Sequence, residues 1–246
     1  MSLQLHATAA EPYSPQGSDE VRLEGHPGSR VFIELRTAAA YRLVIGRPPT
    51  EHKPGIIGLL AFASLLRDIW AAAKTGDPFA RWWLLKIEAA ITRAETIVEP
   101  ALTSVRKALA ASAPLEIDLR RGHPPRRLDL LFACPYAYYG ARLVKQLDVL
   151  VLALDTGVDI GALRKADTTM ARLPCEKALR HVFASSQGYC DFGLSSEVIE
   201  RHDPKAVDAA ARMGTVPDDV LSGERWPALM DRYTVTSCYR SGHGDD

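Results

Sequence analysis

Apolar residues recur at helical spacing over most of the chain. Between Gly55 and Lys74 they leave hardly any polar face, which predicts a helix that is covered on most sides. A second helix is expected to begin at Asp77-Pro78, because an N-cap aspartate accepts from first-turn amides and proline is tolerated at the first helical position. Its apolar stripe continues to about Ala111, and Pro100 should either kink this helix or divide it. The two helices should be antiparallel and joined near Gly76.

Three shorter segments alternate between apolar and polar residues, as half-buried strands do. The first covers residues 30–37 and leads into a short helix over 38–45, which should end at Gly46 because Pro48-Pro49 cannot continue it. The other two cover residues 115–120 and 127–132 and flank a basic loop. The pattern therefore predicts short strands on both sides of the long helices.

The second half of the chain returns to helical spacing. Residues 136–154 form the most regular amphipathic stripe, which Asp155-Thr156-Gly157 should end, and another helix should run from about Ile160 to about Gly188 with a disturbance at Pro174. A capped helix is expected from Asp203-Pro204 to Met213-Gly214. The predicted fold is mainly α with a small β component (α+β). Residues 1–29 are expected to be a flexible leader, 30–222 a single mainly helical domain, and 223–246 an irregular tail.

Composition limits the classes of partner. Thirty basic and thirty acidic residues cancel, so attraction to nucleic acid must come from a local basic patch. The cysteines contain no C-x-x-C pair, which favours idle thiols in a reducing compartment over a disulfide framework. No apolar stretch approaches the roughly 20 residues that a membrane span needs. We expect a cytoplasmic protein that does not engage a membrane.

Motifs for common chemistries are missing. The chain lacks the glycine-rich phosphate loops, the H-E-x-x-H zinc helix and the G-x-S-x-G nucleophile elbow, and its seven histidines are scattered. The sequence therefore predicts a protein that is not an enzyme, with no catalytic residues, no cofactor and no metal ligands.

Basic residues gather in two places. Residues 30–53 hold five basic residues against two acidic ones, and four arginines fall within residues 120–127. Arginine can pair in a bidentate way with phosphate or with guanine edges, whereas the alternative interpretation is a solvated loop. The candidate nucleic-acid-binding residues are Arg30, Arg36, Arg42, Arg47, Arg120, Arg121, Arg126 and Arg127.

One topology would give these arginines a common role. A strand with exposed polar side chains followed by two helices is the ribbon-helix-helix plan, in which two chains pair their strands and insert the ribbon into the major groove. Residues 31–37 and residues 127–132 both precede helices in this way. Either strand could form the ribbon.

Two blocks of sequence also resemble a known family. These are Pro54-Gly55-Ile56-Ile57-Gly58-Leu59 and the run from Asp77 to Glu88 that contains Trp82-Trp83. With Arg42-Leu43, Gly46-Arg47 and the run Val216–Leu221, they resemble proteins encoded on integrating conjugative elements, and are similar to AcaB-type transcriptional activators of conjugative plasmids. The likeness covers roughly residues 31 to 222. It implies a regulator of conjugative-transfer genes that binds DNA as a dimer through a ribbon-helix-helix-like element.

Two functional hypotheses follow. The first is a cytoplasmic regulator that binds double-stranded DNA as a homodimer through the arginines named above, with conjugation or transcription proteins as further partners. The second is a structural or adaptor protein of the conjugation machinery, which the zero net charge favours.

Overall fold

The computed structural model describes residues 31–112, 124–201 and 203–230. Within them the fold is mainly helical with one two-stranded antiparallel sheet, so the predicted mainly α fold with a small β component is confirmed. The elements, in chain order, are β1 (Phe32–Leu35), α1 (Ala38–Ile45), α2 (Leu59–Lys74), α3 (Pro78–Ser112), β2 (Arg126–Asp129), α4 (Pro135–Asp159), α5 (Lys165–Ala184), α6 (Ser196–Glu200), α7 (Pro204–Met213) and α8 (Asp218–Leu221).

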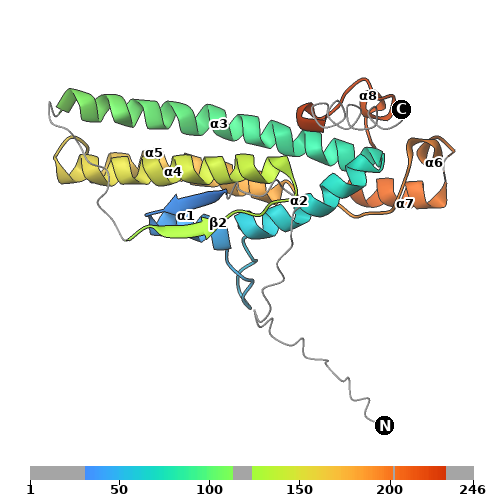
Figure 1. Ribbon diagram of the computed structural model, residues 1–246, viewed down its shortest axis with the longest axis horizontal. Helices are drawn as coiled ribbons and strands as arrows, with labels where there is room; N and C mark the ends of the chain where they lie inside the picture. Colours follow the sequence, from blue (N-terminus) through green and yellow to red (C-terminus); the bar gives the residue numbers. More distant parts are fainter. Residues whose placement is uncertain (1–30, 113–123, 202, 231–246) are drawn as a thin grey trace, which may run out of the picture.

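Three long helices form the body of the molecule. α3, α4 and α5 pack against one another, and Figure 1 shows α1 and the two strands on the side of α4 that faces away from α3, while α2 rises from that side to pack against α3. α4 is central, because it also contacts α1, α2 and β1. Leu143, Leu147 and Leu150 of α4 are completely buried, as the regular stripe over 136–154 requires.

The helix predicted from Gly55 to Lys74 differs from α2 in two ways. α2 begins at Leu59, because residues 47–56 form a projecting hairpin before it. It is also not covered on most sides, since Leu60 is 50% exposed and Leu65 is 37% exposed. That prediction was wrong because α3 and α4 cover one side of α2 and leave the opposite side in solvent.

Two helices pass through prolines without ending. Pro100 lies inside α3 and Pro174 lies inside α5. Both prolines are on exposed faces, so the carbonyl group that loses its intrahelical donor can bond to water instead. The buried neighbours Val98 and Leu102 hold α3 on both sides of Pro100. The sequence allowed Pro100 either to kink α3 or to divide it, and α3 is not divided.

The end predicted for α4 at Asp155-Thr156-Gly157 was wrong. α4 continues to Asp159, and Gly157 is buried within it. A Cβ atom at residue 157 would lie 2.6 Å from a side-chain carbon of Leu163, so the glycine permits close packing of the α4–α5 connection. Here glycine marks a close contact and not a helix end.

The strands pair in a way that the sequence did not reveal. β1 pairs with β2 of the same chain, with Glu34 opposite Arg127 and Leu35 opposite Arg126. The strand predicted over 127–132 is confirmed only as far as Asp129. The strand predicted over 115–120 and the leader expected over 1–29 lie outside the described residues. We refer to β1 and β2 together as the ribbon.

The double-tryptophan block holds the C-terminal segment. Lys86 Nζ lies 3.2 Å from the ring centre of Trp82 and 3.8 Å from that of Trp83, and burial lowers the pKa of Lys86. The rings of Trp83 and Tyr189 are 6.0 Å apart, and a Cβ atom at Gly214 would lie 3.3 Å from the Trp82 ring. We call this region, residues 81–86 with residues 187–230, the tryptophan corner.

The packing at this corner extends past residue 222. Arg81 is 5% exposed and its guanidinium stacks on Trp226, 4.6 Å from the ring centre. Leu229 and Met230 are buried. Leu229 and Met230, in the segment that the pattern assigns to an irregular tail, therefore contribute to the core, and residues 231–246 of that tail lie outside the described residues.

Both helix starts predicted at Asp-Pro pairs are confirmed. The Asp77 carboxylate accepts from the amides of Phe79 (2.7 Å) and Ala80 (3.3 Å), and Asp203 accepts from the amide of Lys205 (2.8 Å). α7 also ends as expected, with Gly214 at a positive φ of 88°. The Tyr189 hydroxyl donates to Asp77 (2.9 Å), and burial raises the pKa of Asp77.

Candidate nucleic-acid interface

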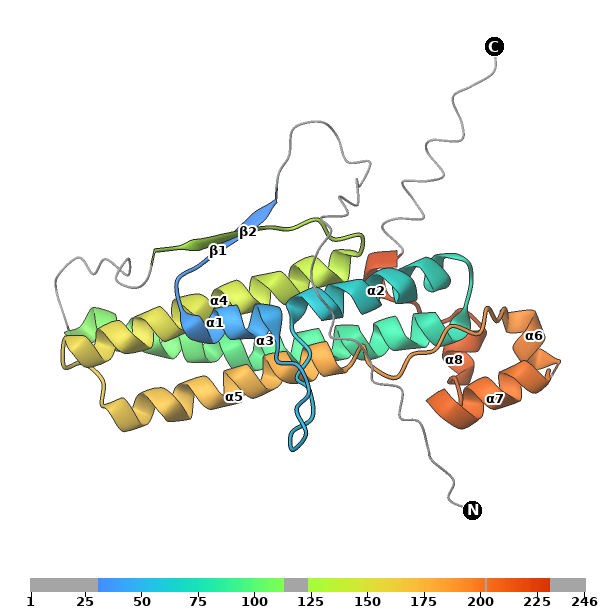
Figure 2. The same cartoon turned by 90° about the horizontal axis from the view of Figure 1, so that it is seen from below.

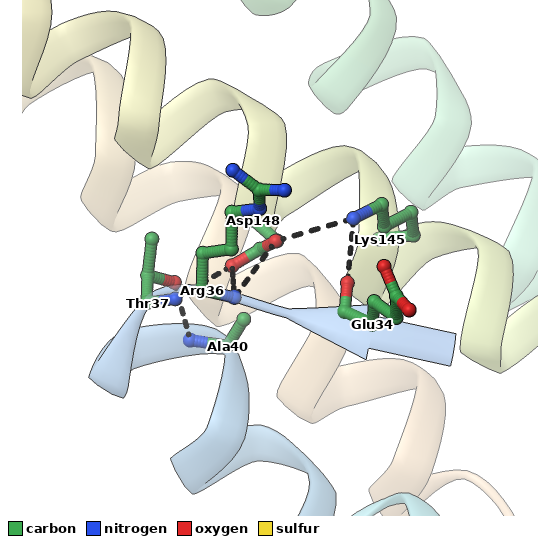
Figure 3. Close-up of polar contacts among 6 residues, drawn as sticks. All are labelled: Glu34, Arg36, Thr37, Ala40, Lys145 and Asp148. Carbon is green, nitrogen blue, oxygen red and sulfur yellow. Dashed lines mark hydrogen bonds and ion pairs between the residues drawn. The ribbon is translucent and has the colours of Figure 1, made fainter. Parts of the chain in front are cut away.

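The junction between β1 and α1 is fixed by one buried carboxylate. Asp148 of α4 is completely buried and accepts from the backbone amides of Arg36 (3.1 Å and 3.2 Å) and Thr37 (2.9 Å), as Figure 3 shows. Lys145, one turn earlier on α4, donates to the Glu34 carbonyl oxygen (2.5 Å) and lies 3.5 Å from Asp148. These bonds satisfy the Glu34 carbonyl oxygen on the edge of β1 that faces away from β2, together with the two amides that follow β1, and they hold the ribbon on α4.

The start of α1 is capped at the same place. The Thr37 hydroxyl accepts from the Ala40 amide (3.2 Å), as expected of an N-cap threonine. Because Asp148 holds the Thr37 amide, the first turn of α1 has a defined position relative to the end of the ribbon. The positive end of the α1 helix dipole therefore points to a fixed site on the surface.

Three of the predicted arginines meet at this site. Arg36 follows β1, Arg42 lies one turn into α1, and Arg126 begins β2, yet all three line a hollow of about 180 Å³ beside Thr37 and Ala38. None of the described residues that line this hollow is acidic. We call Arg36, Arg42 and Arg126 the arginine corner.

The arginine corner has no neutralising partner within the part of the chain that the structure describes. None of its three guanidinium groups forms an ion pair there. Arg126 instead stacks on Tyr41, with its guanidinium carbon 4.3 Å from the ring centre. This stacking limits the positions that the Arg126 guanidinium group can adopt. Three unpaired guanidinium groups around the N-terminus of a helix form a site that suits a phosphate group.

A larger hollow adjoins the arginine corner but has a different character. It measures about 580 Å³ and shares Arg36 and Arg42 with the smaller one, but its other wall carries Asp155, Asp159 and Arg172. Burial raises the pKa of Asp155. Because this wall brings both signs of charge, the smaller hollow is the better site for an anion.

The outward face of the ribbon is mixed in charge. Ile33 and Leu35 are buried beneath the ribbon, so Phe32, Glu34, Arg127 and Asp129 share the opposite face. The Arg127 guanidinium carbon lies 3.8 Å from the ring centre of Phe32, and its Nε lies 3.5 Å from Asp129. This face offers arginine and carboxylate groups that can read base edges, but it does not supply a net positive charge.

Arg47 lies apart from the arginine corner, at the base of a hairpin between α1 and α2. Its backbone pairs with Ile56, and its side chain donates to the Pro54 carbonyl oxygen (3.0 Å). The structure therefore separates the eight candidate arginines. Arg36, Arg42 and Arg126 meet at one site, Arg127 lies on the ribbon, Arg47 lies on the hairpin, and Arg30, Arg120 and Arg121 lie outside the described residues.

Sequence reasoning missed the residues that build this site. Asp148 and Lys145 position the ribbon, and Tyr41 supports Arg126. Asp148 did leave a signal, because it is a lone acidic residue between Leu147 and Leu150 on the apolar stripe of α4. A buried acid among leucines indicates that backbone donors approach from another element.

Among the described residues, no cluster of three or more His, Cys, Asp or Glu side chains is arranged to hold a metal ion. Nor does that part of the chain contain a helix with the length and apolar character needed to cross a lipid bilayer.

A family model described as transcriptional regulator AcaB matches residues 24–232. The chain belongs to the AcaB family. That range contains every described element from β1 to α8, including the ribbon, the arginine corner and the tryptophan corner. The resemblance noted from the double-tryptophan block is confirmed, and the family is one of transcriptional regulators.

One solved structure is also similar, that of selenomethionine-containing AcaB from uropathogenic E. coli. The match has a TM-score of 0.39 and 16% sequence identity, and covers 80% of this chain and 95% of that chain. A comparison with curated proteins gives no match.

Proposed function

We propose that this protein is a DNA-binding transcriptional regulator of conjugative-transfer genes on an integrating conjugative element. It acts in the cytoplasm by non-covalent recognition and without catalysis. The observation that carries the proposal is the arginine corner, where Arg36, Arg42 and Arg126 line one hollow beside α1 and form no ion pair within the described residues. Membership of a family of transcriptional regulators supports it.

In this proposal the arginine corner and the ribbon have different roles in DNA binding. The arginine corner binds a backbone phosphate, which positions the protein on the duplex without reading sequence. The adjoining ribbon then presents Arg127 to guanine edges, and Glu34 and Asp129 to the amino groups of cytosine. This division explains how a chain with no net charge can bind DNA, since the cations are local and the ribbon face is mixed.

The ribbon-helix-helix element has a modified form in this proposal. Two chains were expected to pair one strand each, but β1 already pairs with β2 of its own chain, and each strand is followed by helices. One chain therefore supplies a complete ribbon. A homodimer adds a second ribbon beside the first, which doubles the number of base contacts.

β2 offers the edge for that dimer. The outer edge of β1 is occupied by Lys145 and Asp148, whereas no described strand pairs with the outer edge of β2. If two β2 strands pair around a two-fold axis with Leu128 opposite Leu128, Arg127 lies opposite Asp129 of the second copy. Opposite charges at directly opposed positions stabilise such a pair.

Charge exchange tests the dimer. Arg127→Glu places like charges opposite one another and should shift the protein toward monomer in analytical ultracentrifugation. Asp129→Arg should do the same, and the double variant should restore the dimer because the exchange recreates the pair. A double variant as monomeric as the single ones, or a monomeric wild type, would remove this interface from the proposal.

A mobility-shift experiment tests DNA binding itself. Duplexes that cover the promoters of the element's transfer genes should be bound at low salt, and binding should weaken steeply at a second, higher salt concentration because phosphate contacts release counterions. A duplex from an unrelated coding region serves as the control for specificity. Absence of any shift at low salt would reject the proposal and favour the adaptor hypothesis.

A further inference from the structure

A rigid hairpin projects from the body between α1 and α2. Arg47 and Ile56 exchange two backbone hydrogen bonds of 2.8 Å each, and Thr50 and Lys53 exchange two more at 2.9 Å and 3.2 Å. Residues 47–55 are all exposed, so the hairpin buries almost nothing against the rest of the chain. We call residues 47–56 the arm. Figure 2 shows it extending away from the helices.

The base of the arm is fixed by two glycines. A Cβ atom at Gly58 would lie 2.4 Å from the Gly46 nitrogen and 2.5 Å from the Val44 carbonyl oxygen, and Gly46 has a positive φ of 70°. The chain thus crosses itself at van der Waals contact where the arm leaves and re-enters the body. Pro48, Pro49 and Pro54 remove further backbone freedom within the arm.

This rigidity has no evident benefit for folding. An exposed segment that contributes no buried area does not offset the entropy cost of ordering it. A rigid exposed hairpin favours binding to a partner, because little conformational entropy is then lost when the complex forms. The arm carries Arg47, His52 and Lys53 against the single acid Glu51, so an anionic partner suits it better than a cationic one.

The position of the arm relates it to the arginine corner. Figure 1 shows the arm on the same side of the α3–α4 layer as α1 and the ribbon. α1 has eight residues and is therefore about 12 Å long, with Arg36 before its start, Arg42 in its last turn and the arm after its end. The major groove of B-DNA is also about 12 Å wide. A duplex whose phosphate lies at the start of α1, beside Arg36 and Arg126, therefore has its next backbone and minor groove within reach of the arm.

We propose that the arm is a second DNA contact, which enters the minor groove beyond the phosphate held by the arginine corner, with Lys53 and His52 near its tip. This inference rests on the proposed DNA-binding function. It adds a contact that the ribbon cannot make, because Figure 2 shows the ribbon and the arm on opposite sides of α1.

An arm-shortened variant gives the sharpest test. Residues 48–55 are replaced by Asn-Gly, since the hydrogen-bonded pair of Arg47 and Ile56 is the geometry that a two-residue hairpin turn closes. The thermal midpoint should stay unchanged because the arm buries almost nothing. Lys53→Glu is a second variant that keeps the arm, and Lys107→Glu on the exposed face of α3 makes the same charge change far from the site.

The probe is the tightest-binding duplex that the wild-type protein selects from a random-sequence library. The arm-shortened variant should bind it about tenfold more weakly, and Lys53→Glu should lower the slope of log affinity against log salt by about one. Hydroxyl-radical footprints should lose protection in the minor groove at the flank next to each arginine corner, and Lys107→Glu should match the wild type. Unchanged affinity and footprint in the arm variants would overturn the inference while leaving the proposed function intact. Failure of the wild type to select any duplex would reject both.

Discussion

The tryptophan corner and the arginine corner use cationic side chains in opposite ways. In the tryptophan corner, Arg81 and Lys86 are covered by indole rings, and burial lowers the pKa of both. In the arginine corner, the three guanidinium groups line an open hollow. Cations that are desolvated against indole rings hold elements together, whereas cations that line an open hollow without an ion-pair partner are available to a ligand, even where one of them, Arg126, stacks on a ring.

The two regions also differ in what holds them in place. The tryptophan corner is held by contact area, since aromatic rings from α3 pack against a segment more than a hundred residues later in the chain. The arginine corner is held by a few hydrogen bonds to Asp148 and by the Thr37 cap. Substitutions should therefore affect stability strongly at the first region and DNA binding at the second.

The largest effect is expected at the tryptophan corner. Trp83→Ala removes a side chain that is 6% exposed and should lower the free energy of unfolding by about 3–5 kcal/mol. Because Tyr189 loses its ring contact, limited proteolysis should cleave within residues 187–230. Phe32→Ala on the ribbon is the control, since Phe32 is 45% exposed and its truncation should cost less than about 1 kcal/mol. Equal losses would contradict the comparison.

A smaller loss of stability, coupled to a loss of function, is expected at Asp148. Asp148→Ala leaves the buried amides of Arg36 and Thr37 without their acceptor and should cost about 1–3 kcal/mol in chemical denaturation. DNA affinity should fall as well, because the arginine corner loses its fixed geometry. Glu99→Ala, on the exposed face of α3, should change neither quantity appreciably. Retained DNA affinity in a folded Asp148→Ala protein would refute the positioning role.

The arginine corner itself should matter for binding and not for folding. The Arg36→Ala/Arg126→Ala double variant should keep its free energy of unfolding within about 0.5 kcal/mol of wild type, because these side chains are not in the core. Its salt slope for DNA binding should fall by about two, because each of the two protomers loses its contact with one backbone phosphate. A large loss of stability, or an unchanged salt slope, would remove the functional assignment.

The smallest effect is a pH dependence at Asp77, which accepts a hydrogen bond from Tyr189 of the tryptophan corner. Burial raises the pKa of Asp77 above its ordinary value of 3.8, so the folded state binds this proton more tightly than the unfolded state. Asp77 therefore opposes folding at neutral pH, and this penalty is relieved as the pH falls through its folded-state pKa toward 3.8. Wild type should gain stability relative to Asp77→Asn over that window, as measured by denaturation at a series of pH values. A constant difference between the two proteins would show that Asp77 has an ordinary pKa.

The sequence by itself determined most of the helices and their starts. Asp77 and Asp203 cap helices through bonds to amides two or three residues away, so these starts are local and readable. α1 matches its predicted range because Thr37 and Gly46 bound it by local geometry. The arginine clusters were also visible, although not the subset of three that meets at one site.

Only the tertiary structure decided which strands pair, which arginines gather and which way the arm points. β1 and β2 are separated by two long helices, and neither strand encodes its partner over such a distance. Arg36 and Arg126 meet because Asp148, in a third segment, anchors the end of β1. The arm became a fixed projection only where Gly46 and Gly58 touch. Local hydrogen bonds and periodicity can be read along the chain, whereas contacts between distant segments depend on packing that no single stretch of sequence contains.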